Sequence, residues 1–338
     1  MMASWKDKLN GDPIPWLLEN DLRQPGVRYF TLRDIIGQDE TDSEVKAAKA
    51  AIMTSGPVPV ILEGDWDKPG YSFRPKYRRT EYTLINIAQL GADGADPRIR
   101  ASCEIILSQY IDNNGGLSFS RIPSDFSNCT AGIMGAALID LGWLDDRRLQ
   151  RAMEWLAQTI TGERVTDAPD RDTSKGDYKS GNSSPLFACS NHNANLPCAW
   201  GAIKALIALS KVPAAQRTSN MHEAIKLGVE LLLSRDPAVA DYPFGFGNKP
   251  SSRWFTFFFP LGTSADVLQN LEILAALGQA ENPKLANALD LVISKQNQQG
   301  RWKLEYTYVG IQEKKGQPSK WITLRALRVL KAAYPETE

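Results

Sequence analysis

The sequence predicts an all-α fold of the α/α toroid type, a closed double-layered barrel of about six helical hairpins. Two observations favour this class. Apolar stripes with helical spacing recur along the chain at intervals of roughly 50 to 70 residues, and signals for β-strands are scarce. Each hairpin is expected to contribute one buried inner helix and one outer helix.

The recurring stripes predict the first helix of each hairpin. They contain small and apolar residues nearly all round, as in "GIMGAALIDLG", which is typical of buried helices. The six stripes end at Gly37, Gly91, Gly142, Ser210, Gly278 and Lys331.

A second helix is expected after each of the first five stripes, following a short polar turn. Glycine after a stripe fits a helix C-cap, and Asp-Pro or Asn-Pro fits the start of the next helix. The clearest second helices are "GADPRIRASCEIILSQ", "WLDDRRLQRAMEWLAQ" and "AENPKLANALDLVISKQ". They carry more charge, which favours the outer layer. The pair Asp145 and Asp146 is interpreted as helix capping in such a turn.

The composition excludes several classes of protein. The 338 residues allow one large domain, and we expect a single domain over 1–338 with loop insertions at about 162–188 and 241–262. Lys and Arg (39) balance Asp and Glu (39), so no net charge favours nucleic acid. We find no signal peptide and no apolar window that would span a bilayer, and therefore expect a cytoplasmic protein without an integral membrane segment. The four cysteines are then expected to be free thiols or ligands.

The repeat brings the rare reactive residues to one end of the predicted barrel. Parallel inner helices share one rim at their N-termini, where free amide donors and positive dipole ends suit a binding site. Counting back from the stripe ends places six positions on this rim: Pro25, Arg79, Thr130, Cys198, Asp266 and Ser319. The predicted catalytic residues around this mouth are Cys129, Cys189, His192, Cys198 and Asp266.

Three kinds of chemistry remain open for this cluster. A zinc ion bound by three of Cys129, Cys189, His192, Cys198 and Asp266 would leave one position for water or substrate. Metal-free chemistry would use a thiol at a helix N-terminus and His192 as a proton carrier. Alternatively, the cysteines are small buried residues and the histidine caps a turn. Zinc is therefore only a possible cofactor, and no nucleotide-binding glycine motif is present.

Aromatic and charged residues near the same rim are predicted to bind substrate. Residues 162–188 form a polar segment without helical periodicity, which is either a lid over the mouth or a surface loop that takes no part in the site. Residues 241–262 are dense in aromatic side chains, which either pack in the core or line an apolar pocket. The predicted substrate-binding residues are Arg79, Glu81, Tyr82, Trp200, Trp254, Phe257 and Trp321.

One local motif resembles a known family. Residues 296–302 read "QNQQGRW", with Gln296, Gly300 and Trp302 spaced as in the Gln-Trp motif of the terpene cyclase and protein prenyltransferase superfamily, which contains the squalene-cyclase repeat. In that superfamily the glutamine caps a helix and stacks on the tryptophan. The Asp-rich acid motif of squalene-cyclase-type enzymes is missing here.

The resemblance implies an enzyme acting on a small, largely apolar substrate in a central cavity, with an isoprenoid as one such substrate. The chemistry would be acid–base elimination or hydration, isomerisation or cyclisation, that is, a lyase or isomerase. Two alternatives are a zinc-dependent transferase or hydrolase of the prenyltransferase type, and a non-catalytic toroid that binds a hydrophobic ligand. A homo-oligomer is also compatible with the sequence.

Overall fold

The computed structural model describes residues 4–64, 80–119, 126–163, 185–189, 193–243, 251–310 and 313–336. Within these ranges the regular secondary structure is helical apart from two short strands and isolated bridges, so the predicted all-α fold class is confirmed. The chain divides into two compact units. Unit 1 comprises Met1–Asp93, Phe255–Leu261 and Asp266–Glu338, and unit 2 comprises Gly94–Trp254 and Gly262–Ala265. The single domain over 1–338 stays a prediction.

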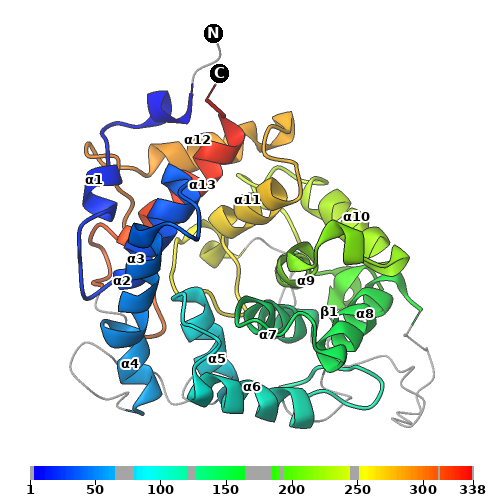
Figure 1. Ribbon diagram of the computed structural model, residues 1–338. Coiled ribbons are helices and arrows are strands. Elements are labelled where there is room, and N and C mark those ends of the chain that lie inside the picture. The colour runs from blue at the N-terminus through cyan, green and yellow to red at the C-terminus, as the bar shows by residue number, and fades with distance from the viewer. Residues whose placement is uncertain are drawn as a thin grey trace. The chain divides into compact units, whose positions relative to one another are not determined.

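Unit 1 contains the N-terminal and C-terminal helices of the chain (Figure 1). Short helical turns are η1 (Trp5–Lys8), η2 (Thr31–Ile36) and η8 (Pro283–Leu285). Its α-helices are α1 (Ile14–Leu17), α2 (Pro25–Phe30), α3 (Ser43–Thr54), α4 (Pro57–Leu62), α5 (Thr80–Gln89), α11 (Val267–Ala276), α12 (Ala286–Ser294) and α13 (Lys320–Ala333). Helix α13 is buried along most of its length, as expected of an inner helix.

Unit 2 contains the helices between them. The α-helices are α6 (Pro97–Gln109), α7 (Asn128–Asp140), α8 (Arg147–Thr161), α9 (Ala199–Lys211) and α10 (Ser219–Leu232), with turns η5 (Pro185–Phe187), η6 (Ala214–Gln216) and η7 (Ser252–Phe255, which ends in unit 1). Strands β1 (Ala188–Cys189) and β2 (Asn193–Pro197) pair antiparallel before α9.

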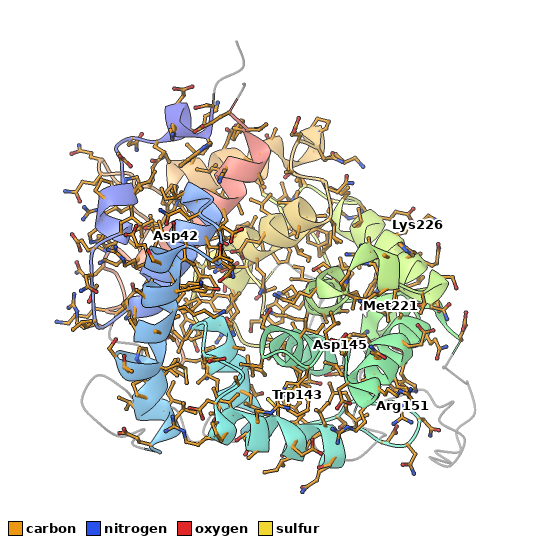
Figure 2. The ribbon with its side chains drawn as sticks, in the orientation of Figure 1. Asp42, Trp143, Asp145, Arg151, Met221 and Lys226 are labelled. Atoms are coloured by element: carbon orange, nitrogen blue, oxygen red, sulfur yellow. The ribbon has the colours of Figure 1, made fainter. Side chains whose placement is uncertain are left out.

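The two kinds of helix predicted from the stripes are present in unit 2. Helices α7 and α9 are buried on nearly all sides, whereas α8 and α10 bury one face and expose the other. Figure 2 shows Lys226 of α10 at the periphery, where its side chain is exposed, while Met221 of the same helix is buried. The turn before α8 also behaves as predicted, because the side chain of Asp146 caps α8 by accepting the N–H of Arg148 at 2.8 Å.

Glycine ends the buried helices as the sequence predicts. Gly142 after α7 and Gly278 after α11 have φ angles of 85° and 77°, in the left-handed region that glycine adopts at a C-cap. After α7, the N–H of Trp143 returns to the carbonyl of Leu138 at 3.0 Å. The chain can therefore turn at once toward the next helix.

One stretch of the described chain, Ser43–Leu62, has the length and mean hydropathy (1.2) of a membrane span. Because it consists of α3 and α4 separated by Ser55 and Gly56, it is not one continuous helix. A single such stretch is weak evidence for a membrane segment.

Candidate thiol site

The site is built on α7 and α9, which run parallel and pack backbone to backbone. A Cβ atom on Gly132 of α7 would lie 2.3 Å from the carbonyl oxygen of Lys204 in α9, so the two backbones touch there. At the C-terminal ends, Lys211 donates to Asp140 at 2.7 Å. The helices lie side by side in Figure 1, and their N-terminal ends are therefore neighbours.

Two cysteines meet at these N-terminal ends. Cys129 lies in the first turn of α7 and is half-buried, and Cys198 is the N-cap residue of α9 and is 3% exposed. A Cβ atom on Gly201 would lie 3.9 Å from Sγ of Cys129 and 3.7 Å from Cβ of Cys198. Both residues are free cysteines. The two side chains thus flank the same small space, which Gly201 leaves open because it has no side chain.

The local sequence fixes the backbone of both cysteines. Ser127 is the N-cap of α7, and its side chain accepts the N–H of Thr130 at 3.3 Å. Cys198 occupies a position where Ser, Thr, Asp and Asn are the usual caps. Its N–H donates to the carbonyl of Phe187 at 2.9 Å. Leu186 and Phe187 have φ angles of 60° and 62°, which are unfavourable for residues with a Cβ.

Cys103 provides a contrast within the same unit. It lies in α6 and is fully buried, as the sequence predicts for a small apolar residue. Burial raises the pKa of its thiol to about 12, against a weaker opposite effect of a hydrogen bond with Trp143. Since the thiolate is the reactive form of cysteine, Cys103 should be inert near neutral pH.

The structure describes the other predicted residues of this end only in part. The backbone of Cys189 lies in β1, where Ala188 pairs with Pro197, the residue before Cys198. The side chain of Cys189 and all of His192 and Arg79 lie outside the described residues. Most of the predicted lid, 162–188, also lies outside them.

Metal binding is not decided by these positions. Among the residues that the structure describes, no group of three or more His, Cys, Asp or Glu side chains could hold a metal ion. Two of the predicted ligands are not covered, since His192 and the side chain of Cys189 lie outside the described residues. The zinc site therefore stays a prediction.

Asp266, the fifth predicted catalytic residue, belongs to unit 1 and is fully buried. It caps α11 by accepting the N–H of Gln269 at 2.7 Å, and its other oxygen accepts the N–H of Phe258 at 3.3 Å. The guanidinium of Arg325 in α13 binds both Asp266, at 3.0 Å, and Glu272, at 2.7 Å. Because both oxygens of Asp266 are engaged, we do not include it in the thiol site.

Three of the predicted substrate-binding aromatic residues, Trp254, Phe257 and Trp321, pack inside their own units. Trp254 in unit 2 donates its Nε1–H to the carbonyl of Pro237 at 2.8 Å. In unit 1, Trp321 stacks on Phe259 with ring centroids 4.4 Å apart. Phe257 is buried under the ammonium group of Lys295, 4.4 Å from the ring centroid. Of the two explanations offered for the aromatic segment, the contacts support core packing.

The remaining predicted residues divide between the units. Glu81 and Tyr82 lie in the first turn of α5 in unit 1, where Glu81 is buried and Tyr82 half-buried. Trp200 follows Cys198 in the first turn of α9 and is half-buried. The structure therefore brings Cys129, Cys198 and Trp200 to one end of unit 2.

Lys204 and Glu313 are charged residues that had not been singled out from the sequence. Lys204 is fully buried in α9, and its only sequence signal is one charge within the apolar run "AIKALIALS". Glu313 in unit 1 accepts the N–H of Lys320 at 2.8 Å and the hydroxyl of Ser319, at the N-terminus of α13. Burial of this carboxyl group raises the pKa of Glu313 to about 7. Nothing in the local sequence "QEKKGQPSK" distinguishes it.

Comparisons with known proteins give little beyond the fold. No protein-family model matches the sequence, and no curated protein matches it. Among solved structures, the chain is similar to the GH76A alpha-1,6-mannanase from Salegentibacter sp. HEL1_6 at 14% sequence identity and a TM-score of 0.41. The match covers 93% of this chain and 89% of that chain. A likeness at this level assigns no activity.

The expected family is corrected by these findings. Membership of the terpene cyclase and protein prenyltransferase superfamily is wrong, since no family model matches and the comparison with solved structures gives a mannanase. The functions that the resemblance implied are wrong with it. They are lyase, isomerase or cyclase chemistry on an apolar isoprenoid, the zinc-dependent transferase or hydrolase of the prenyltransferase type, and the apolar-ligand-binding toroid.

The physical reason is visible at the Gln-Trp motif. The side chain of Gln296 binds the N-terminal segment, accepting the N–H of Asn10 and donating to the carbonyl of Lys8, both at 2.8 Å. Trp302 donates its Nε1–H to the carbonyl of Val292 at 2.7 Å. A Cβ atom on Gly300 would lie 2.2 Å from the carbonyl oxygen of Gly11, so this glycine is needed for close approach. The motif thus holds the start of the chain in place.

Proposed function

We propose that the chain is an enzyme that works through thiol chemistry at the N-terminal ends of α7 and α9, with Cys129 as the reacting group. The observation that carries the proposal is the meeting of Cys129 and Cys198 at Gly201. Free cysteines are commonly buried and inert, as Cys103 is. Cys129 differs because it is half-buried and has a second thiol beside it.

The surroundings of Cys129 favour acyl transfer. The first backbone N–H groups of a helix have no acceptor within the helix and lie at the positive end of its dipole. Such donors stabilise the negative charge that develops on a carbonyl oxygen under attack. The hydroxyl groups of Ser127 and Thr130, 2.6 Å apart, make this end of α7 polar. The substrate would therefore be a polar carbonyl compound rather than a hydrocarbon.

The reaction would proceed through a covalent intermediate. The sulfur of Cys129 attacks the carbonyl carbon, its proton passes to solvent, and the alcohol or phenol of the ester leaves. Water then attacks the thioester, which releases the acid and restores the thiol. A cytoplasmic location belongs to the same proposal, because that compartment keeps thiols reduced.

A generic acyl donor tests the proposal without knowledge of the natural substrate. With p-nitrophenyl acetate at about pH 8, we expect one acetyl group on the peptide that contains Cys129, found by mass spectrometry. Cys129→Ser should abolish it, and Cys103→Ser should leave it unchanged. The acetyl group should be lost again over time as the thioester is hydrolysed. If Cys129 is acetylated no faster than Cys103, the proposal is wrong.

A further inference from the structure

We infer that Cys129 and Cys198 form a reversible disulfide bond when the protein meets a hydroperoxide. This oxidation would occupy the sulfur that the proposed reaction needs, and a dithiol reductant would restore it. The inference rests on the proposed function in so far as it assigns a regulation to the same site. The disulfide itself depends only on the geometry around Gly201.

The geometry places parts of both cysteine side chains around one point at the start of α9. A disulfide needs the two Cβ atoms within about 4.5 Å and the two sulfurs in contact. Sγ of Cys129 and Cβ of Cys198 both lie within van der Waals distance of the position that a Cβ of Gly201 would take, at 3.9 and 3.7 Å. No side chain from Gly201 stands between them. Since both distances are measured to one point, Sγ of Cys129 and Cβ of Cys198 lie less than 8 Å apart. The inference requires that rotation of the two side chains bring the sulfurs into contact across this space.

The backbone around the two residues differs. Cys129 is held within α7, while Cys198 is an N-cap residue with extended angles, φ −109° and ψ 116°. The N–H of Cys198 is bonded to the carbonyl of Phe187, so its backbone is fixed and its side chain would turn toward Cys129 by rotation about χ1.

The difference in exposure assigns the order of events. Cys129 is half-buried, whereas Cys198 is 3% exposed. A hydroperoxide in solution therefore meets Cys129 first. Cys198 is then the resolving thiol, which is shielded from the oxidant but adjacent to its product. Cys103 takes no part, because it is fully buried in α6.

The chemistry balances in two steps. The thiolate of Cys129 attacks one oxygen of the hydroperoxide, the O–O bond breaks, and the alcohol leaves with a proton from solvent, which gives a sulfenic acid on Cys129. The sulfur of Cys198 attacks the sulfenic sulfur, the S–O bond breaks, and water leaves with the thiol proton. The two thiols have lost two electrons in total, and the hydroperoxide has gained them.

The test treats the full-length protein with hydrogen peroxide and maps its peptides by mass spectrometry. We expect the protein to lose two hydrogen atoms and to give one linked pair of peptides, containing Cys129 and Cys198, which dithiothreitol separates. Cys198→Ser should stop the reaction at the sulfenic acid, which dimedone traps on Cys129. Cys103→Ser should behave as the parent protein.

A matched variant tests the role of the open space. In Gly201→Ala the added methyl group makes ordinary contacts, with Cβ of Asn128 at 3.5 Å as the nearest. The fold should tolerate it, but the methyl group takes up space in contact with Sγ of Cys129 and Cβ of Cys198 and should slow disulfide formation at least about tenfold. Unfolding by urea checks that the variant remains folded.

The outcomes separate this inference from the proposed function. A disulfide bond between Cys129 and Cys198 in the parent protein, formed more slowly in Gly201→Ala, supports the inferred regulation. Linkage of either residue to another cysteine, or oxidation of Cys129 without linkage, overturns it even if Cys129 is acetylated by the ester. Linkage without acetylation overturns the proposed function and leaves the disulfide standing.

Discussion

Replacing each of three glycines in the α7–α9 pair by alanine should change the stability of the protein in a graded order. A Cβ on Gly132 would lie 2.3 Å from the backbone carbonyl oxygen of Lys204. A Cβ on Gly135 would lie 2.4 Å from Cε of Met153, the end of a flexible side chain. A Cβ on Gly201 would meet nothing closer than 3.5 Å.

The magnitudes follow from two opposing effects. Each replacement favours the helix by about 0.8–1 kcal/mol, because alanine loses less conformational freedom than glycine. Gly201→Ala should keep most of this gain. In Gly135→Ala, movement of the methionine should cost about 1 kcal/mol, so the net change is near zero. In Gly132→Ala two backbones must separate, and we expect a net loss of about 2 kcal/mol or more.

Urea unfolding, followed by circular dichroism, measures the three differences in one experiment. The three variants have the same chemical change in the same pair of helices, so each is a control for the others. We expect the free energy of unfolding to be highest for Gly201→Ala, lower for Gly135→Ala and lowest for Gly132→Ala. If Gly132→Ala is as stable as Gly201→Ala, the backbone contact between α7 and α9 is not what limits the approach of these helices.

Three further predictions concern charge and metal. The raised pKa of Glu313, about 7 against 4.5 for an ordinary glutamate, means that the folded state holds this proton more tightly than the unfolded state. The resulting stabilisation is complete below pH 4.5 and is lost as the pH rises through 7, so Glu313→Gln should flatten the fall in unfolding free energy between these values. Arg325→Met should destabilise unit 1 by about 3–5 kcal/mol, seen in urea unfolding, because it leaves the buried Asp266 without its partner; a loss below about 1 kcal/mol would contradict this account. Elemental analysis of protein never exposed to chelator tests the zinc prediction, where a stoichiometric amount that falls in Cys129→Ser and Cys198→Ser supports it and a trace amount rejects it.

The helices and their starts could be predicted because their signals are local. The rim positions Cys198, Asp266 and Ser319 are the N-cap residues of α9, α11 and α13. Thr130 and Arg79 fall within two residues of the observed starts of α7 and α5. Caps and apolar stripes act over three or four residues, so a count along one sequence can find them.

The environments of the site residues could not be predicted, because they depend on contacts distant in sequence. Asp266 has the same local appearance as a catalytic aspartate, and only Arg325, 59 residues away, shows that its charge is neutralised. Gln296 lies in a sequence that resembles a family motif, but its side chain binds the backbone of Asn10, 286 residues away. The meeting of Cys129 with Cys198 had been expected from the repeat, but the role of Gly201 between them appears only in three dimensions.

The division of the chain has a consequence for its synthesis. Unit 2 is nearly continuous in sequence, whereas unit 1 is assembled from residues 1–93 and from segments after residue 254. The N–H of Trp5 binds the carbonyl of Tyr334 at 2.9 Å, and Gln296 holds the backbone of Asn10. During synthesis, the residues that bind the N-terminal segment, Gln296 and Tyr334, emerge from the ribosome after all of unit 2. We therefore expect unit 2 to fold first on the ribosome, while the N-terminal helices wait until the final stretch of chain has emerged.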